Sequence, residues 1–303
     1  MTTGLPSNCS DGGRAVTFSI VAADPEAGDW GVAVASRFPC VGAVVPWAKA
    51  GVGAVATQSW ANTALGPEGL SLMGEGVPAE EAMRGLLDQD EGRADRQVGF
   101  VDGAGRAATF TGSKCMTWAG GVTGPRFAAQ GNILVGKEVV AQLARVFAES
   151  DGDLCDRLLA ALLAGDAVGG DRRGRQSAAL LVVRGGGGYE GRNDRYIDLR
   201  VDDHPDAPHE LARLFEVWDT TMLIRNDPLL AAGPELVADL QRRLAVLGKY
   251  TGEPSGTYDE PTRMALAGWA GEHNLEGRLR DDDQISNLLV TEIRDVTPEL
   301  PAP

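Results

Sequence analysis

The chain has 303 residues, of which 43% are hydrophobic and 23% charged. This length exceeds that of a usual single domain with one core, so we predict one large domain and one small one. Its formal net charge of −15 at pH 7 repels phosphate backbones and anionic lipid surfaces, which argues against nucleic-acid and membrane partners. No apolar run approaches the length that crosses a bilayer.

Residues 1–16 show neither helical nor strand periodicity, and we interpret them as a disordered extension or a misassigned start. They have no basic start and no long apolar core, so we expect no secretion signal there. Thr17 follows, at the first position of the first predicted strand. Two routes could place Thr17 at the head of the chain. The chain could be cleaved before Thr17, or the GTG codon of Val16 could be the true start, translated as a Met that is then removed. We prefer the second route. The alternative is that Thr17 has no catalytic role and is simply the first residue of a strand, a position that suits a β-branched side chain.

Blocks of strands and pairs of helices follow one another along the next two hundred residues. The turns between consecutive strands are too short for parallel crossovers, so the strands should pair antiparallel. Such blocks predict an α+β fold in which two sheets stack face to face with helices outside, a four-layer αββα sandwich. The predicted strands are residues 17–23, 31–36, 51–58, 97–102, 106–111, 127–134, 177–184 and 196–201, and the predicted helices are residues 66–74, 79–88, 137–149, 154–163 and 208–218.

The composition changes after Trp218. We predict that residues 17–219 form the large domain, 220–234 a connector, 235–296 a small helical domain and 297–303 a tail. In the small domain, leucines recur at helical spacing, and a glycine-containing loop separates the first helix from the next.

Five segments in order along the chain carry a family resemblance: residues 18–22, 31–39, 51–58, 130–132 and 169–177. They resemble the DUF1028 family of uncharacterised proteins, which is assigned to the Ntn-hydrolase superfamily, the hydrolases with an N-terminal nucleophile. The resemblance runs over roughly residues 17–218 and implies the Ntn fold and amidohydrolase chemistry, without a substrate. Members begin at a Met directly before the Thr-Phe-Ser segment, so the extension here is a departure that favours a misassigned start. Residues 235–293 resemble a peptidoglycan-binding domain found behind some members.

Thr17 is the predicted nucleophile. A free α-amine has a pKa near 8, so its neutral form can take the proton from the hydroxyl of its own residue. Lys49 is the first candidate cation to tune that amine, because threonine-type Ntn enzymes such as proteasome subunits carry a lysine at a similar distance along the chain; otherwise it is a surface lysine. Arg37 is the second candidate and could bind a substrate carboxylate or pair with an acidic loop. Asn132 could donate to an oxyanion or serve as a turn residue.

Further polar residues are candidates for binding the substrate. Gln58 and Asn62 follow the third predicted strand and have the donors and acceptors that orient an amide. The glycine-rich loop 169–177 either captures an anionic substrate or is closed by a structural arginine network, and its candidates are Asp171, Arg172, Arg175 and Ser177.

We expect neither a metal nor another cofactor. The Asp202-Asp203-His204 segment lacks convincing companion ligands. The four cysteines are widely spaced without a paired motif, which predicts reduced thiols in a cytoplasmic protein.

The sequence therefore favours an amidohydrolase acting on a small amide. The alternatives are a non-catalytic ligand-binding protein on the same scaffold and a cell-wall protein. The sequence also allows a homo-oligomer. Peptidoglycan binding is not favoured, because no secretion signal is expected and leucines and Trp269 at helical spacing are typical of a core. Tyr258 and Trp269 are the aromatic residues to test for sugar binding.

Overall fold

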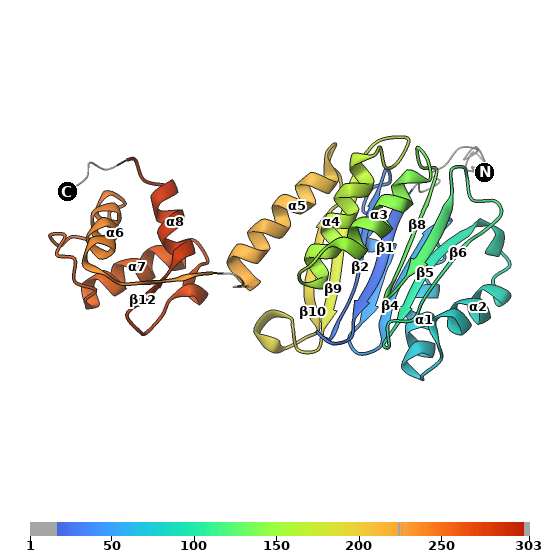
Figure 1. Cartoon of the computed structure of the whole chain (residues 1–303), viewed down its shortest axis with the longest axis horizontal. Coiled ribbons are helices and arrows are strands. Elements are labelled where there is room, and N and C mark those ends of the chain that lie inside the picture. Colours follow the sequence, from blue (N-terminus) through green and yellow to red (C-terminus); the bar gives the residue numbers. More distant parts are fainter. Residues whose placement is uncertain (1–16, 224, 226, 300–303) are drawn as a thin grey trace, which may run out of the picture. The chain divides into compact units, whose positions relative to one another are not determined.

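The computed structural model describes residues 17–223, 225 and 227–299 (Figure 1). The predicted extension at residues 1–16 and the last four residues of the predicted tail lie outside these ranges. The chain divides into two compact units, Met1–Arg213 and Leu214–Pro303. No helix in the described ranges combines the length and the apolar character that crossing a bilayer requires.

The first unit contains two sheets whose neighbouring strands are all antiparallel. The larger sheet has the order β10-β9-β2-β1-β8-β7, formed by β1 (Thr17–Asp24), β2 (Asp29–Ser36), β7 (Gly120–Gly124), β8 (Phe127–Asn132), β9 (Ser177–Arg184) and β10 (Arg195–Val201). The smaller sheet has the order β3-β4-β5-β6, formed by β3 (Pro46–Lys49), β4 (Gly53–Ser59), β5 (Arg96–Asp102) and β6 (Ala107–Thr111).

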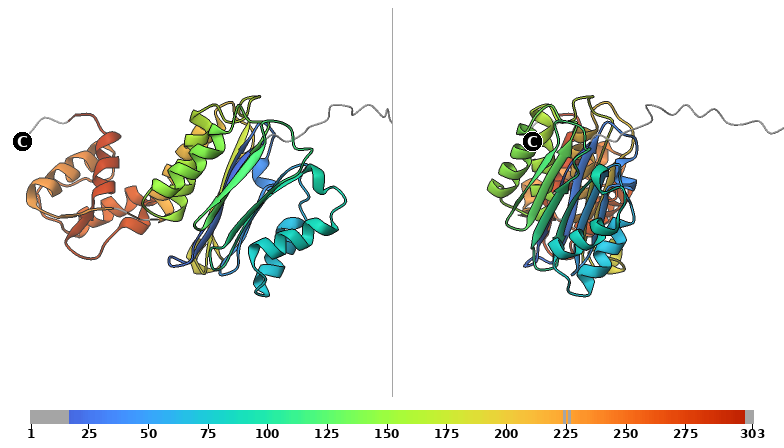
Figure 2. Two further views of the ribbon diagram at one scale, coloured as in Figure 1. Left: turned by 45° about the vertical axis from the view of Figure 1, so that its right-hand side comes forward. Right: turned by 90° about the vertical axis from the view of Figure 1, so that its right-hand side faces the viewer.

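The two sheets face each other, because β1 contacts β4 and β5 contacts β8. Helices α1 (Leu65–Gly74) and α2 (Ala79–Gln89) cover the outer face of the smaller sheet, and α3 (Glu138–Glu149) and α4 (Leu154–Ala167) cover that of the larger one (Figure 2). The predicted mixed fold with antiparallel sheets is confirmed. Helix α5 (Ala207–Trp218) follows β10 and contains the division between the two units.

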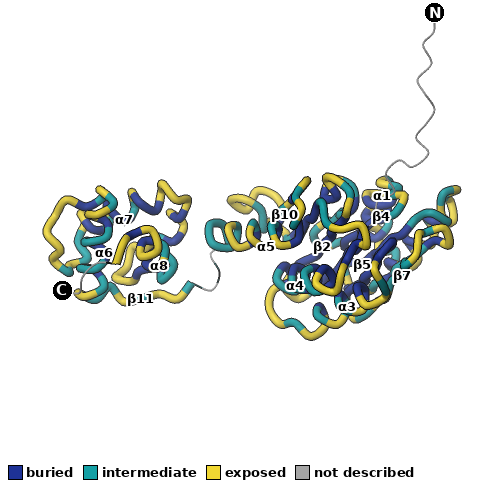
Figure 3. The backbone as a smooth tube through the Cα atoms, turned by 90° about the horizontal axis from the view of Figure 1, so that it is seen from above, coloured by how far each residue is buried: buried dark blue, intermediate teal, exposed yellow. Residues whose placement is uncertain are grey.

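The central strands are almost continuously apolar, because they are buried on both faces (Figure 3). Between the sheets the core consists mainly of small side chains, such as Val21, Val34 and Ala56. On the helical side, two glycines of α1 permit close approach: a Cβ on Gly66 would lie 2.3 Å from the ring of Trp47, and one on Gly69 would lie 2.4 Å from the ring of Phe100.

The second unit has its own core, built on helices α6 (Pro234–Val246), α7 (Glu260–Glu272) and α8 (Asn287–Asp295) around the buried Trp269. A small antiparallel pair, β11 (Leu229–Ala231) and β12 (Gln284–Ser286), completes it. The Asp259 carboxylate caps α7 by accepting from Thr262 N at 3.1 Å. A helical region behind the mixed domain is therefore present, as predicted.

Candidate functional site

Thr17 is fully buried at the first position of β1, a central strand of the larger sheet. It pairs with Ser36 of β2 on one side and with Asn132 of β8 on the other, and Ser36 pairs in turn with Ser177 of β9. Paired residues of an antiparallel sheet point to the same face, which here is the face toward the smaller sheet. Ser177, Ser36, Thr17 and Asn132 thus form one polar row across four strands, and the Thr17 and Ser36 hydroxyl oxygens lie 3.2 Å apart.

A buried hydrogen-bond network joins this row to the smaller sheet. Gln97 of β5 is its centre: the Gln97 Oε1 accepts from Gln58 Nε2 and from Asn132 Nδ2, both at 2.9 Å. Gln58 also accepts from the Ser19 hydroxyl at 2.7 Å, and its Nε2 lies 3.4 Å from Thr17 O. Because buried amides are costly unless paired, these contacts fix the orientation of the Gln58 and Asn132 side chains.

The sequence prediction did not include Gln97 or its neighbour Gln130. Gln130 Nε2 donates to the Ser19 hydroxyl at 2.7 Å. Space for the Gln130 amide comes from Gly99 of β5, since a Cβ there would lie 2.3 Å from Gln130 Oε1. A signal was available in the sequence: Gln97 and Gln130 are uncharged amides inside otherwise apolar strands.

Asp171 lies in the loop between α4 and β9. Its carboxylate accepts from Arg37 N at 2.7 Å, directly after Ser36, and its backbone pairs with Leu134, two residues after Asn132. Asp171 therefore touches the chain just beyond both strand neighbours of Thr17. Burial raises the pKa of Asp171, although Arg173, whose N–H donates to it at 2.8 Å, acts in the opposite direction.

Two other predicted residues of this loop, Arg175 and Ser177, form hydrogen bonds within the protein. Arg175 donates from Nε to Asp166 Oδ1 and from Nη1 to Asp206 Oδ1, both at 2.9 Å. The Ser177 hydroxyl donates to Phe38 O and accepts from Val41 N at 3.2 Å. Arg172 is exposed. The structural arginine network is thus present for Arg175, while Arg172 stays a prediction for substrate binding.

A pocket of about 350 Å³ opens at this end of the sheet. Arg37, which is exposed at its edge, donates from Nη1 to Arg175 O at 3.0 Å. Thr17 is not among the lining residues, whereas its hydrogen-bonded neighbour Ser36 is. The lining residues are Phe18, Ala35, Ser36, Arg37, Asp166, Gly169, Asp171, Gly174, Arg175, Ser177, Pro205 and Pro208.

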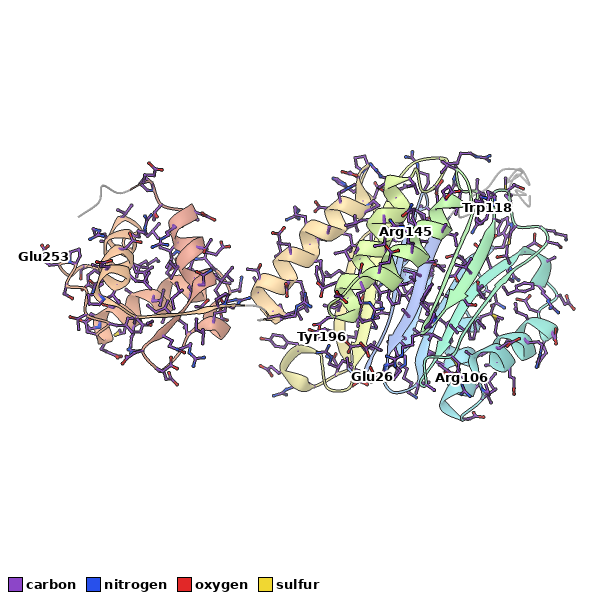
Figure 4. The ribbon with its side chains drawn as sticks, in the orientation of Figure 1. Glu26, Arg106, Trp118, Arg145, Tyr196 and Glu253 are labelled. Carbon is purple, nitrogen blue, oxygen red and sulfur yellow. The ribbon has the colours of Figure 1, made fainter. Side chains whose placement is uncertain are left out.

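The prediction that Lys49 tunes Thr17 needs correction, because the two residues lie at opposite ends of the sandwich. The Gln58 side chain near the end of β4 reaches Thr17, whereas Lys49 pairs with Gly53 at the start of β4. Five residues of strand separate these positions, which is about 17 Å. Glu26, in the turn after β1, marks the end of that strand opposite to Thr17 (Figure 4). Strand β3 leads the chain away from Thr17, and this direction cannot be read from spacing.

Asn62 also does not reach Thr17. Its Nδ2 donates to Asp90 Oδ2 at 3.0 Å, and its Oδ1 accepts from Ala64 N at 3.2 Å. The same Asp90 carboxylate binds Arg96. Asn62 is therefore part of a clamp between α2 and the smaller sheet, and the predicted role in orienting a substrate does not fit its position.

Two clusters contain side chains of the types that bind metal ions. In the Asp202-Asp203-His204 segment, Asp203 accepts from Gln176 Nε2 at 3.1 Å and His204 Nδ1 accepts from Asp206 N at 3.1 Å. Elsewhere in the described residues, Asp153, Cys155 and Asp156 bring possible ligand atoms within 4.8 Å of one another. A cluster of this kind carries no metal assignment, since exposed acidic groups are common without one.

The two aromatic candidates of the second unit are covered. Trp269 is 2% exposed and stacks on His273, with ring centroids 4.3 Å apart. The ring of Tyr258 lies 4.0 Å below the guanidinium of Arg263. Trp269 therefore offers no open face for stacking on a sugar, and Arg263 occupies one face of the partly buried Tyr258.

Comparison with known proteins identifies both regions. The family model DUF1028, described as a family of unknown function, matches residues 17–211. A second family model, described as "Putative peptidoglycan binding domain", matches residues 230–291. The chain is 36% identical to a Silicibacter pomeroyi protein that carries the DUF1028 model and whose crystal structure is known. That match covers 68% of this chain and 90% of the other, with a TM-score of 0.62. No curated protein matches. The chain therefore belongs to the DUF1028 family, with a region similar to a peptidoglycan-binding domain behind the family domain.

Proposed function

We propose that the first unit is an Ntn-type amidohydrolase that cleaves a small amide with Thr17 as its nucleophile. The observation that carries this proposal is the position of Thr17: it opens a central strand, between two polar neighbours, with its side chain toward the facing sheet. The succession of helices, sheet, sheet and helices agrees with the four-layer sandwich that the Ntn assignment implies.

The reaction follows from the groups near Thr17. Its hydroxyl oxygen attacks the amide carbon while its own α-amine takes the proton, and the C–N bond then breaks as that proton passes to the leaving amine. Water, deprotonated by the same α-amine, cleaves the resulting ester. The Asp171 carboxylate would stabilise the transient ammonium, because it contacts the chain just beyond both strand neighbours of Thr17.

Asn132 is the side chain best placed to bind the oxyanion. One of its two N–H groups is directed to Gln97 Oε1 by the 2.9 Å hydrogen bond, which leaves the second for a negatively charged oxygen. Gln97 is therefore a positioning residue in this scheme. Arg37 takes the place proposed for a cation in the sequence analysis, because Lys49 is at the other end of the sandwich.

Thr17 can act as nucleophile and base only when it heads the chain, since a peptide nitrogen has no basic lone pair. The decisive measurement is the intact mass and first residue of the protein made from its natural gene context, with both possible starts available. A chain that begins at Thr17 supports the hydrolase. A chain that retains residues 1–16 contradicts it.

Activity can then be tested on the protein that begins at Thr17, with a panel of small amides. Thr17→Ala should reduce turnover by roughly a thousandfold or more, because it removes the nucleophile. Thr57→Ala is the matched control, since Thr57 is also a buried strand threonine but gives its hydroxyl to Asn62 O at 3.1 Å, toward α1. Unchanged turnover in Thr17→Ala, with thermal unfolding like that of the control, would exclude this nucleophile.

A second candidate is binding without chemistry, to which the match of residues 230–291 to a peptidoglycan-binding model lends weak support. In that case the full chain should sediment with purified murein, and Thr17→Ala should sediment equally. Absence of sedimentation removes this candidate. The burial of Trp269 argues against that residue as a sugar platform.

A further inference from the structure

The pocket beside the polar row contains charges of both signs, and most of them are neutralised within the protein. Arg175 binds Asp166 through two contacts, of 2.9 and 2.7 Å, and also binds Asp206. Asp171 is held by the backbone N–H groups of Arg37 and Arg173. These groups are therefore committed to structure and have little charge left for a ligand.

The Arg37 guanidinium differs from them. It lines the pocket, yet it forms no ion pair with any carboxylate among the residues that the structure describes. Its Nη1 donates to Arg175 O at 3.0 Å, and its backbone N–H is held by Asp171. Both ends of the residue are thus anchored, and the edge formed by Nε and Nη2 remains for a ligand. That edge matches the two oxygens of a carboxylate.

We propose that this pocket binds a small amide that carries a carboxylate, with the carboxylate on Arg37 and the amide directed toward Thr17. This inference rests on the proposed function and names the class of its substrate. Ser36 lines the same pocket as Arg37, and its hydroxyl lies 3.2 Å from that of Thr17, so a ligand with its carboxylate on Arg37 would direct its amide to the Ser36 side of the pocket. N-acylated small amino acids have this arrangement. A volume of about 350 Å³ is at the low end for ligand pockets, which also favours a small molecule.

The test uses binding and does not depend on turnover. Full-length Thr17→Ala protein is titrated calorimetrically with N-acetylglycine and with N-acetylglycinamide, which have the same shape but differ in charge. We expect N-acetylglycine to bind about tenfold more tightly, as a charge-assisted bidentate contact implies. Adding Arg37→Gln should abolish this preference, and adding Arg37→Lys should keep part of it, because Lys retains the charge without the fork.

Arg84→Gln is the matched control. It removes the same charge from an exposed arginine of α2 that does not line the pocket, so the preference for N-acetylglycine should survive. Equal affinity for the two probes, no binding of either, or an equal loss with Arg84→Gln would overturn the proposal. A preference that depends on Arg37 in a protein whose Thr17 proves unreactive would support the carboxylate subsite and reject only the proposed chemistry.

Discussion

Asp171 connects the ends of two strands around Thr17. Its two carboxylate oxygens accept from the backbone N–H groups of Arg37 and Arg173, at 2.7 and 2.8 Å. A neutral amide has only one oxygen, so it can accept from one of these donors and must present an N–H group to the other. The contacts around Thr17 therefore require a carboxylate or a carboxylic acid at this position.

We predict that Asp171→Asn lowers the free energy of unfolding by about 1–3 kcal/mol, the range expected when a buried donor loses its partner. Urea denaturation at pH 7 measures this loss. Asp202→Asn is the control, because Asp202 is exposed and gives only its backbone oxygen to Cys40 N. Equal stability of the two variants would show that the Asp171 contacts do not matter energetically.

For single residues, the sequence predicted the location of the candidate site better than it predicted the role of each residue in it. Thr17, Arg37, Asn132 and Asp171 meet at one end of the sheet, as their motifs indicated. Lys49 does not, because distance along a chain says nothing about which way an antiparallel strand runs. The role of Gln97 was not predictable either, since it depends on which residues of the other sheet face it.

Among the elements, the missed strands are the short or glycine-rich ones. Strand β3 has four residues, and β7 is the segment Gly-Gly-Val-Thr-Gly, which has no apolar alternation to recognise. Tertiary pairing with β4 and β8 defines them. The longer strands and the amphipathic helices α2 and α3 were predictable, because their apolar spacing matches their period.

Asp90 links three elements at the end of α2. It accepts from Nε and Nη2 of Arg96 at the start of β5, at 2.8 and 3.1 Å, and from Asn62 after β4. The Arg96 hydrogen bonds lower the pKa of Asp90 to about 2, against the effect of burial. A carboxylate with a depressed pKa stabilises the folded state above its ordinary pKa and loses that contribution as the pH falls through the folded value.

Asp90→Asn should therefore cost about 2 kcal/mol at pH 7, from the shift of nearly two pKa units. The difference from the unmutated protein should shrink between pH 4 and pH 2. Denaturant titrations at pH 7, 4 and 2.5 measure it, with Asp88→Asn as the control because the Asp88–Arg93 pair is exposed. A difference independent of pH would contradict the assigned pKa.

On the scale of the whole chain, the sequence predicted two folded parts, and the compact units meet inside α5, at Arg213 and Leu214. Because one helix continues across this division, no change in amino-acid composition marks the division in the sequence. In the second unit, the buried Arg278 donates to Thr220 O at 2.6 Å and pairs with Asp227 at 2.9 Å. Arg278 thus fixes two positions of the predicted connector, Thr220 and Asp227, to the small helical core.

Arg278→Leu should raise amide hydrogen exchange around Thr220 and in β11 at least about tenfold, because several buried acceptors lose their partner. Mass spectrometry of peptides from the full chain measures this change. Arg280→Leu is the control, since Arg280 pairs with Asp282 at the surface. Exchange that is the same in both variants would show that Arg278 does not hold this segment.

The polar row across β9, β2, β1 and β8 also has a kinetic consequence. Its four members come from positions 17, 36, 132 and 177, so their contacts have a high sequence separation and form late in folding. During synthesis, β1 has its neighbour β2 early, but β9 does not exist until Ser177 has left the ribosome. A growing chain thus carries Thr17 for most of its synthesis before β9 can complete the polar row.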